Sequence, residues 1–132
     1  MVDKRPEQKI VEISYQQFGS IANKLVRSVQ QRLGKNLDNI SGVYGVPRGG
    51  TAFALHMSHH LGVPMLKTPE KNCIICEDIS DSGNTLLPFQ RKGYFIVALF
   101  CKKKSKVIPN VFFKMVAEEA WLMFPWESEK GL

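Results

Sequence analysis

Short apolar runs alternate along this chain with segments of helical periodicity, and this alternation constrains the fold more than any other feature. The clearest helix spans residues 14–33, where apolar side chains recur at helical spacing; Ser14 with Gln17 makes a capping-box start, and Gly34 supplies the stop. Strands are expected at 40–46, 63–66, 73–76, 94–101 and 111–116, helices at 51–61 and 85–91, and a tail at 121–127. Such alternation predicts a single-domain α/β fold over residues 1–132, with a mostly parallel, twisted sheet and helices on both faces.

Charge and composition limit the partners of the chain. It carries 18 Lys and Arg against 12 Asp and Glu, a formal charge of +6, which favours anionic partners, either small phosphates or nucleic acid. No apolar run approaches the roughly 18 residues of a membrane span. Residues 1–9 are charged and lack the apolar stretch of a secretory signal, so a cytoplasmic location is expected. The three cysteines, Cys73, Cys76 and Cys101, are too few for a disulfide framework and are expected to be reduced.

The apolar run 73–76 leads directly into two adjacent acids, Glu77 and Asp78. Ligands of parallel sheets bind at the carboxyl ends of strands, so these acids are expected at the mouth of a site. Two neighbouring carboxylates repel each other unless a cation or a polyol uses them. Such a pair can accept hydrogen bonds from a sugar diol and can hold Mg²⁺ directly or through water.

A phosphate cradle is expected immediately after these acids, in the loop 81–85. Gly83 permits a positive φ, and successive amides at the start of a helix form an anion-binding concavity. Ser82 and Thr85 add hydroxyl donors. A cradle beside a diol and metal site is the combination that a ribose phosphate requires, although a surface turn with capping acids is the plainer alternative.

Residues 73–86, CIICEDISDSGNTL, closely resemble the phosphoribosyl-pyrophosphate motif of the type I phosphoribosyltransferases. The resemblance implies that Glu77 and Asp78 hold the ribose hydroxyls and Mg²⁺, with Asp78 nearer the metal. Asp81 would be the catalytic residue, exchanging a proton or a hydrogen bond with the purine ring. The 5′-phosphate would be bound by the loop residues Asp81, Ser82, Gly83, Asn84 and Thr85.

Two further segments extend this resemblance. The loop 45–50 resembles the pyrophosphate loop of the family, which assigns Arg48 and Gly49 to pyrophosphate; in isolation it could equally be a tight Pro-Gly turn. Residues 98–128 are similar to the xanthine-guanine branch and imply a small C-terminal hood over the base. In that branch a Lys contacts the purine carbonyl, an aromatic ring stacks on the base, and backbone meets the base edge. The resemblance assigns these roles to Lys102, Trp121 and Leu122, in that order.

What the resemblance implies is a Mg²⁺-dependent purine phosphoribosyltransferase that uses guanine, xanthine or hypoxanthine, releases pyrophosphate, and forms a homodimer or higher oligomer. Plainer readings exist for two of its features. Trp121 could be a core residue, and the lysines at 102, 103, 104 and 106 could line a solvated loop. A nucleic-acid-binding regulator is disfavoured, because few aromatic residues lie near those lysines.

Two other patterns match the residue spacing of a metal site or of a redox cysteine pair, and nothing more. His56 and His60 stand at i, i+4, but no third ligand is apparent. Cys73 and Cys76 have the CxxC form, yet residues three apart on a strand point to opposite faces, so their sulfurs cannot meet.

One segment departs from the family. Members usually carry a long flexible loop that closes over the site, whereas only residues 67–72 join the runs 63–66 and 73–76 here. Two functions therefore stay open: a trimmed transferase, or a regulatory module that binds the sugar phosphate or a nucleotide without chemistry. Intact Asp81, Lys102 and Trp121 favour the enzyme, and the short connection favours the module.

Overall fold

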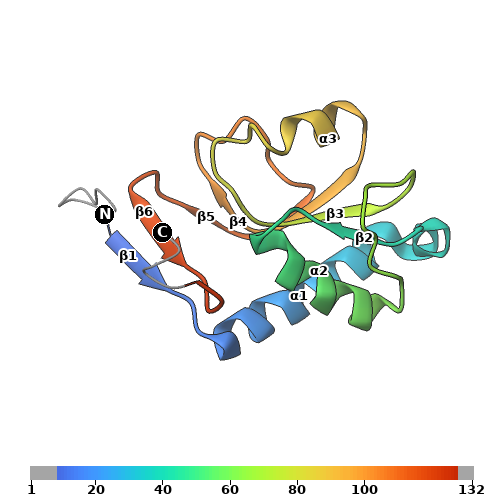
Figure 1. Ribbon diagram of the computed structural model, residues 1–132, viewed down its shortest axis with the longest axis horizontal. Coiled ribbons are helices and arrows are strands. Elements are labelled where there is room, and N and C mark those ends of the chain that lie inside the picture. The colour runs from blue at the N-terminus through green and yellow to red at the C-terminus, as the bar shows by residue number, and fades with distance from the viewer. Residues whose placement is uncertain (1–8, 128–132) are drawn as a thin grey trace.

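Four parallel strands form the central sheet of the computed structural model, which describes residues 9–127 (Figure 1). The spatial order follows the chain: β2 (Val43–Gly45), β3 (Ile74–Ser80), β4 (Phe95–Lys102) and β5 (Val111–Val116). Every described strand pair in it is parallel, so the carboxyl ends of all four strands lie at one edge. The predicted α/β class is confirmed. Residues 1–8, on which most of the argument about a secretory signal rests, lie outside the described part.

Helices cover both faces of this sheet, as predicted. Helices α1 (Tyr15–Leu33) and α2 (Gly49–Leu61) lie on one face, and the short α3 (Leu87–Arg91) lies on the other (Figure 1). A 3-10 helix, η1 (Gly34–Asn39), follows α1 directly. Among residues 9–127, no helix combines the length and apolarity needed to cross a membrane.

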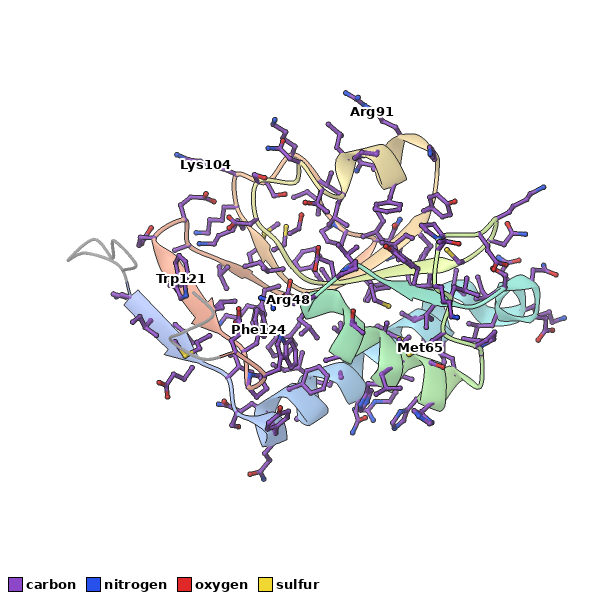
Figure 2. The ribbon with its side chains drawn as sticks, viewed as in Figure 1. Arg48, Met65, Arg91, Lys104, Trp121 and Phe124 are labelled. Carbon is purple, nitrogen blue, oxygen red and sulfur yellow. The ribbon has the colours of Figure 1, made fainter. Side chains whose placement is uncertain are left out.

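A second, two-stranded sheet stands beside the first at the carboxyl edge. It pairs β1 (Lys9–Glu12) with β6 (Ala120–Met123) in parallel, and the two are called the hood below (Figure 1). The hood was expected from the C-terminal tail alone; β1 was not predicted. Trp121 lies on β6, and Phe124 follows it on the side toward the helices (Figure 2).

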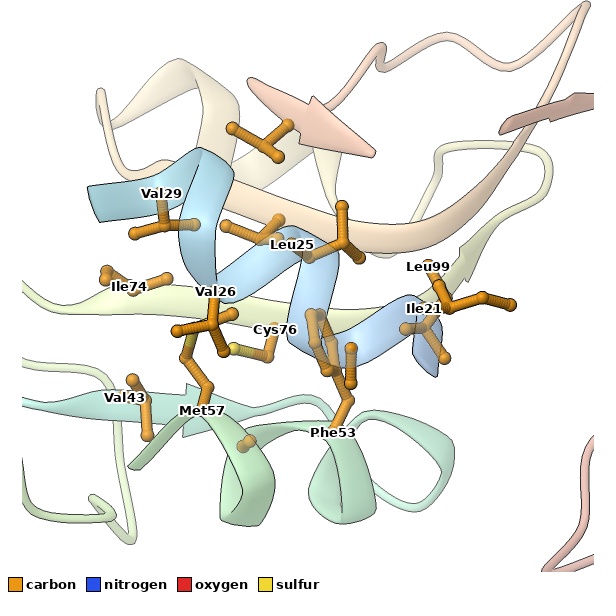
Figure 3. Packing of buried hydrophobic residues seen from close by; sticks show 14 of the residues in the cluster. Ile21, Leu25, Val26, Val29, Val43, Phe53, Met57, Ile74, Cys76 and Leu99 are labelled. Atoms are coloured by element: carbon orange, nitrogen blue, oxygen red, sulfur yellow. The ribbon is translucent and has the colours of Figure 1, made fainter. Parts of the chain in front are cut away.

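Two apolar clusters lie on opposite faces of the central sheet. The larger packs α1 and α2 against β3 and β4, with Phe53, Met57 and Val29 fully buried (Figure 3). The smaller lies on the α3 face and includes Leu86 and Val107. Cys76 belongs to the first cluster and Cys73 to the second, which confirms that the CxxC sulfurs point to opposite faces; all three cysteines are free and buried.

The predicted start of the first helix is confirmed in detail. Ser14 Oγ accepts a hydrogen bond from the Gln17 amide at 3.0 Å, and Gln17 Oε1 accepts one from the Ser14 amide at 2.8 Å. Together these bonds satisfy two backbone donors that the helix itself cannot. The helix ends at Leu33, and Gly34 caps it with a positive φ of 51°.

Several element boundaries differ from those expected. Strand β3 continues through the acids to Ser80 because its ladder with β4 runs as far as Cys101. Helix α3 begins only at Leu87, so it has five residues instead of seven. Residues 63–66 form no strand; Met65 makes only an isolated parallel bridge to Val43. Strand β2 is shorter than expected, and α2 begins two residues early at Gly49.

Candidate functional site

Two adjoining cavities open at the carboxyl ends of β3 and β4. The larger, about 270 Å³, lies under the hood and is called the hood cavity; the smaller, about 70 Å³, is called the loop cavity. Ile79 and Asp81 line both cavities, so the two are neighbours. The hood cavity brings together the following residues predicted from sequence: Asp78, Asp81, Lys102, Trp121 and Leu122. The loop cavity gathers Glu77, Asp81, Ser82, Gly83 and Thr85.

The two acids of the motif face different cavities. Asp78 is half-buried and lines the hood cavity, with its Oδ1 accepting a hydrogen bond from the Ile79 amide at 2.7 Å. Its carboxylate occupies the place where a side chain on Gly49 would begin. Only glycine at position 49 leaves room for this approach, which brings the 45–50 loop against Asp78.

Glu77 lines the loop cavity and is largely buried, with 8% of its surface exposed. Burial is the largest cause that raises the pKa of its carboxyl, and together with the side-chain hydrogen bond to Asp78 and the charge of Asp78 it brings this pKa to about 9. In the ligand-free protein this carboxyl is therefore neutral at pH 7.

The loop 81–85 is held in shape by a second loop that carries Ser105 and Lys106. The Lys106 amide donates to Ser82 O at 2.9 Å, and Lys106 Nζ donates to Asn84 Oδ1 at 2.8 Å. Gly83 has a φ of 89° and packs against the backbone of 106 and 107. The amides of Ser82, Gly83 and Thr85 donate to no acceptor within residues 9–127, so they are free to bind an anion.

The helix that follows the loop 81–85 contributes less to anion binding than predicted. Helix α3 has five residues and starts two positions after Thr85, so its dipole contributes little at the loop. The loop amides and hydroxyls themselves are what an anion would meet. Lys106, one of the lysines that could have lined a solvated loop, is tied to this loop through Asn84.

Lys102 is buried at the end of β4, with 5% of its surface exposed. Its Nζ donates to three carbonyls of the turn before β6: Ala117 O at 3.1 Å, Glu118 O at 2.7 Å and Ala120 O at 2.5 Å. Lys102 lines the hood cavity, but the hydrogen bonds of its ammonium are directed at the protein.

Of two other predicted residues, Trp121 lines the hood cavity and Arg48 does not. Arg48 is exposed at the N-terminal end of α2, which points toward the hood, and it lines neither cavity (Figure 2). The amides of Arg48 and Gly49 donate to no described acceptor. Trp121 is half-buried, lines the hood cavity and belongs to neither core cluster, which disfavours its reading as a core residue.

Several residues of the hood cavity have no short-range sequence signal. Glu118, Ala120, Phe124 and Glu127 line it because the turn before β6 and the segment after β6 return to the carboxyl edge of the central sheet. Phe124 is identifiable in the sequence as apolar, but its place depends on packing against Phe100 at 6.1 Å between ring centroids. The remaining three could not be found from composition or spacing.

The short connection 67–72 lies at the opposite edge of the sheet. The Leu66 amide donates to Val43 O, and the Ser41 amide donates to Asn72 O, so the connection turns beside the amino ends of β2 and β3 (Figure 1). A connection at this edge cannot cover the hood and loop cavities. A larger cavity of about 540 Å³, lined by Asn36, Lys71 and Lys92 among others, lies at this same edge, away from every predicted site residue.

Neither metal-like pattern forms a metal centre. The rings of His56 and His60 stack with centroids 4.1 Å apart, and His56 Nε2 is 2.8 Å from Asn23 Oδ1. Within the described residues, no group of three or more His, Cys, Asp or Glu is arranged around a common point. Mg²⁺ does not require such a group, because it is commonly held by one or two carboxylates, waters and substrate oxygens.

Solved structures confirm the architecture. A purine phosphoribosyltransferase from Pyrococcus horikoshii matches with a TM-score of 0.75 at 23% identity, covering 90% of this chain and 95% of its own. The xanthine-guanine-hypoxanthine phosphoribosyltransferase of Helicobacter pylori matches with a TM-score of 0.77 at 22% identity, covering 92% and 96%. A Neisseria gonorrhoeae protein with bound ppGpp matches with a TM-score of 0.73 at 13% identity, covering 95% and 93%. No protein-family model matches the sequence.

The chain therefore has the type I phosphoribosyltransferase fold. The likeness in fold extends over nine-tenths of the chain or more in these three comparisons.

Proposed function

We propose that this protein transfers the phosphoribosyl group of 5-phosphoribosyl-1-pyrophosphate to a 6-oxopurine base and releases pyrophosphate. The observation that carries the proposal is the junction of the hood and loop cavities at Asp81. The loop cavity offers free amides and hydroxyls to a phosphate, and the hood cavity is lined by Trp121, whose aromatic ring suits a planar base. A nucleotide joins the same two groups through a ribose.

Each step of the reaction has a residue suited to it. A base nitrogen attacks C1 of the ribose as pyrophosphate departs, and the transition state gains positive charge on the sugar and negative charge on the leaving group. The free amides of Arg48 and Gly49, with the Arg48 guanidinium, would stabilise the departing pyrophosphate. Asp81, exposed between the two cavities, would accept the proton or a hydrogen bond from the purine ring.

Magnesium fits one of the two acids better than the other. Asp78 is half-exposed in the hood cavity beside the 45–50 loop, and hard carboxylate oxygens are the ligands that Mg²⁺ prefers. Glu77 is buried and neutral at pH 7, which suits a hydrogen bond to a ribose hydroxyl more than a metal ligand. Mg²⁺ bound at Asp78 would supply charge neutralisation and orientation of the pyrophosphate.

The test is direct. The protein is mixed with Mg²⁺, the sugar pyrophosphate and each purine or pyrimidine base, and nucleotide and pyrophosphate are measured. Nucleotide formed with guanine, xanthine or hypoxanthine supports the proposal. Asp81→Asn should lower turnover far more than it lowers affinity for the sugar pyrophosphate, whereas equal losses in both would contradict the role given to Asp81.

A second function is favoured by the position of the connection 67–72. Because it lies at the amino edge of the sheet, this connection cannot close over the site and exclude water from it. A regulatory module that only binds the sugar phosphate or a nucleotide has no need of such a closing loop. Mg²⁺-dependent binding without product, for every base tried, would support this second function. The homodimer that the resemblance implies is checked by light scattering in the same buffer.

A further inference from the structure

The hood is joined to the body of the protein by few backbone hydrogen bonds. Within residues 9–127, the two-stranded sheet of β1 and β6 shares no ladder with the central sheet. Side chains must therefore hold the hood in place. Its apolar ties are Ile13, just after β1, and Phe124, just after β6, which are both buried in the larger core cluster, and Leu122 of β6 packs against the same cluster.

The polar tie lies at the other end of β6. Lys102 Nζ donates to the carbonyls of Ala117, Glu118 and Ala120, the turn that leads from β5 into β6. An ammonium has three protons, and here each has a carbonyl partner between 2.5 and 3.1 Å away. The Glu118 side chain secures the same turn from a second direction, because its Oε2 accepts from the Lys104 amide at 2.9 Å.

We propose that Lys102 is a positioning residue: it anchors the turn 117–120 and thereby holds Trp121 and Leu122 over the hood cavity. With all three protons committed, Lys102 offers none to a base in the ligand-free protein. A base carbonyl could gain a proton from it only by displacing a carbonyl of the turn, which would then be buried without a donor. The anchoring role concerns the chain alone, and only its effect on base binding rests on the proposed function.

The first test uses the ligand-free protein. Amide hydrogen exchange is followed by NMR in the wild type, in Lys102→Met, and in Lys103→Met as a matched control with an exposed side chain on the same loop. Lys102→Met keeps a side chain of similar length but leaves three carbonyls without a donor, so protection of the amides at 117–122 should fall about tenfold or more. Protection on β3 and β4 should stay within about twofold in all three proteins. Unchanged protection at 117–122 in Lys102→Met overturns the proposal.

A wild-type measurement covers the case in which Lys102→Met does not fold. A buried ammonium held by three carbonyls exchanges its protons slowly, so its NH₃⁺ group should give a resolved ¹⁵N-correlated signal with contacts to the turn 117–120. Exposed lysines such as Lys103 should give none under the same conditions. Absence of a protected Lys102 signal would overturn the anchoring role without any substitution.

A third measurement separates positioning from direct contact with a base. Guanosine 5′-monophosphate binding is measured by calorimetry for Lys102→Met with Trp121 present and in a Trp121→Ala background. If Lys102 acts through the hood, the loss should be about tenfold with Trp121 and less than about twofold without it. Equal fold losses in both backgrounds indicate direct contact and overturn the proposal. Failure of the wild type to bind the nucleotide would count against the proposed function, while the ligand-free exchange result would still decide the role of Lys102.

Discussion

Replacing Gly83 with alanine tests whether the loop at the end of β3 has the shape described. Gly83 has a φ of 89°, a conformation that L side chains rarely adopt. A Cβ at this position would lie 2.8 Å from the backbone nitrogens of Lys106 and Val107 and from Ser105 Oγ. Neither backbone nitrogen can swing aside as the tip of a side chain can, so the 105–107 segment would have to move as a unit.

The expected loss of stability in Gly83→Ala is the sum of a backbone cost and a packing cost. A left-handed conformation costs a non-glycine residue about 1–2 kcal/mol, and forcing atoms into a packed contact adds about 1–3 kcal/mol. Gly83→Ala should therefore lower the free energy of unfolding by about 2–5 kcal/mol. Because the displaced segment also carries Lys106, which is tied to Asn84, the affinity for ribose 5-phosphate should fall as well.

Equilibrium unfolding in urea measures the first effect, with a lower midpoint and an unchanged m-value as the expected signature. The matched control is Gly19→Ala in the middle of α1, where a Cβ would meet nothing within 4 Å. That change should stabilise the protein by about 0.5–1 kcal/mol, because alanine is the better helix former. A Gly83→Ala protein within about 0.5 kcal/mol of the wild type would refute the described packing of this loop.

Three further outcomes are expected. The pKa of Glu77 is raised to about 9, chiefly by burial, so the metal-free wild type should lose stability as pH rises from about 4.5 toward 9; Glu77→Gln should remove this loss and unfold at higher urea at pH 8 than the wild type. The pKa of His56 is lowered, first by burial and then by the two neighbouring histidines, so stability should fall as pH drops below about 6.5, and His56→Gln should show a smaller fall in melting temperature between pH 7 and pH 5. Ser14→Ala removes the capping bond to Gln17 and should cost about 1 kcal/mol in urea unfolding at pH 7.

The parts of the fold that could be predicted are those specified by local pattern. Helix α1 was predicted to within one residue, because a long amphipathic stripe and both caps lie within its own sequence. Strand β1 was missed because its four residues are all exposed and its partner, β6, lies more than a hundred positions away in the chain. The continuation of β3 through Glu77 and Asp78 was missed for a similar reason: pairing with β4 overrides the weak strand propensity of acids.

The features of the candidate site also divide into those that local sequence predicts and those that depend on packing. The acidic motif and the loop 81–85 were predicted because their spacing is local, and the structure brings Asp78 and Asp81 into one cavity. The neutral state of Glu77 could not be predicted, since it depends on burial. The three carbonyl partners of Lys102 lie 15 to 18 positions away, and only the turn before β6 brings them to its ammonium. Sequence could therefore place Lys102 near the site but could not show what its protons bind.

Whether the site transfers a phosphoribosyl group or only binds its ligand depends on how water is excluded from it. In a parallel sheet, only a connection that leaves the carboxyl edge can cover a site at that edge, and the connection 67–72 leaves the other one. Within residues 9–127, the hood covers the side of this edge that holds Trp121, whereas Arg48, the residue predicted to bind pyrophosphate, is exposed. A base in the hood cavity would thus be sheltered by the hood, whereas a leaving group at Arg48 would not be sheltered by it. Within residues 9–127 Arg48 is exposed, so a transferase with this geometry would need another segment, another copy or a partner to cover it, or would release ribose 5-phosphate alongside nucleotide; a binding module needs neither.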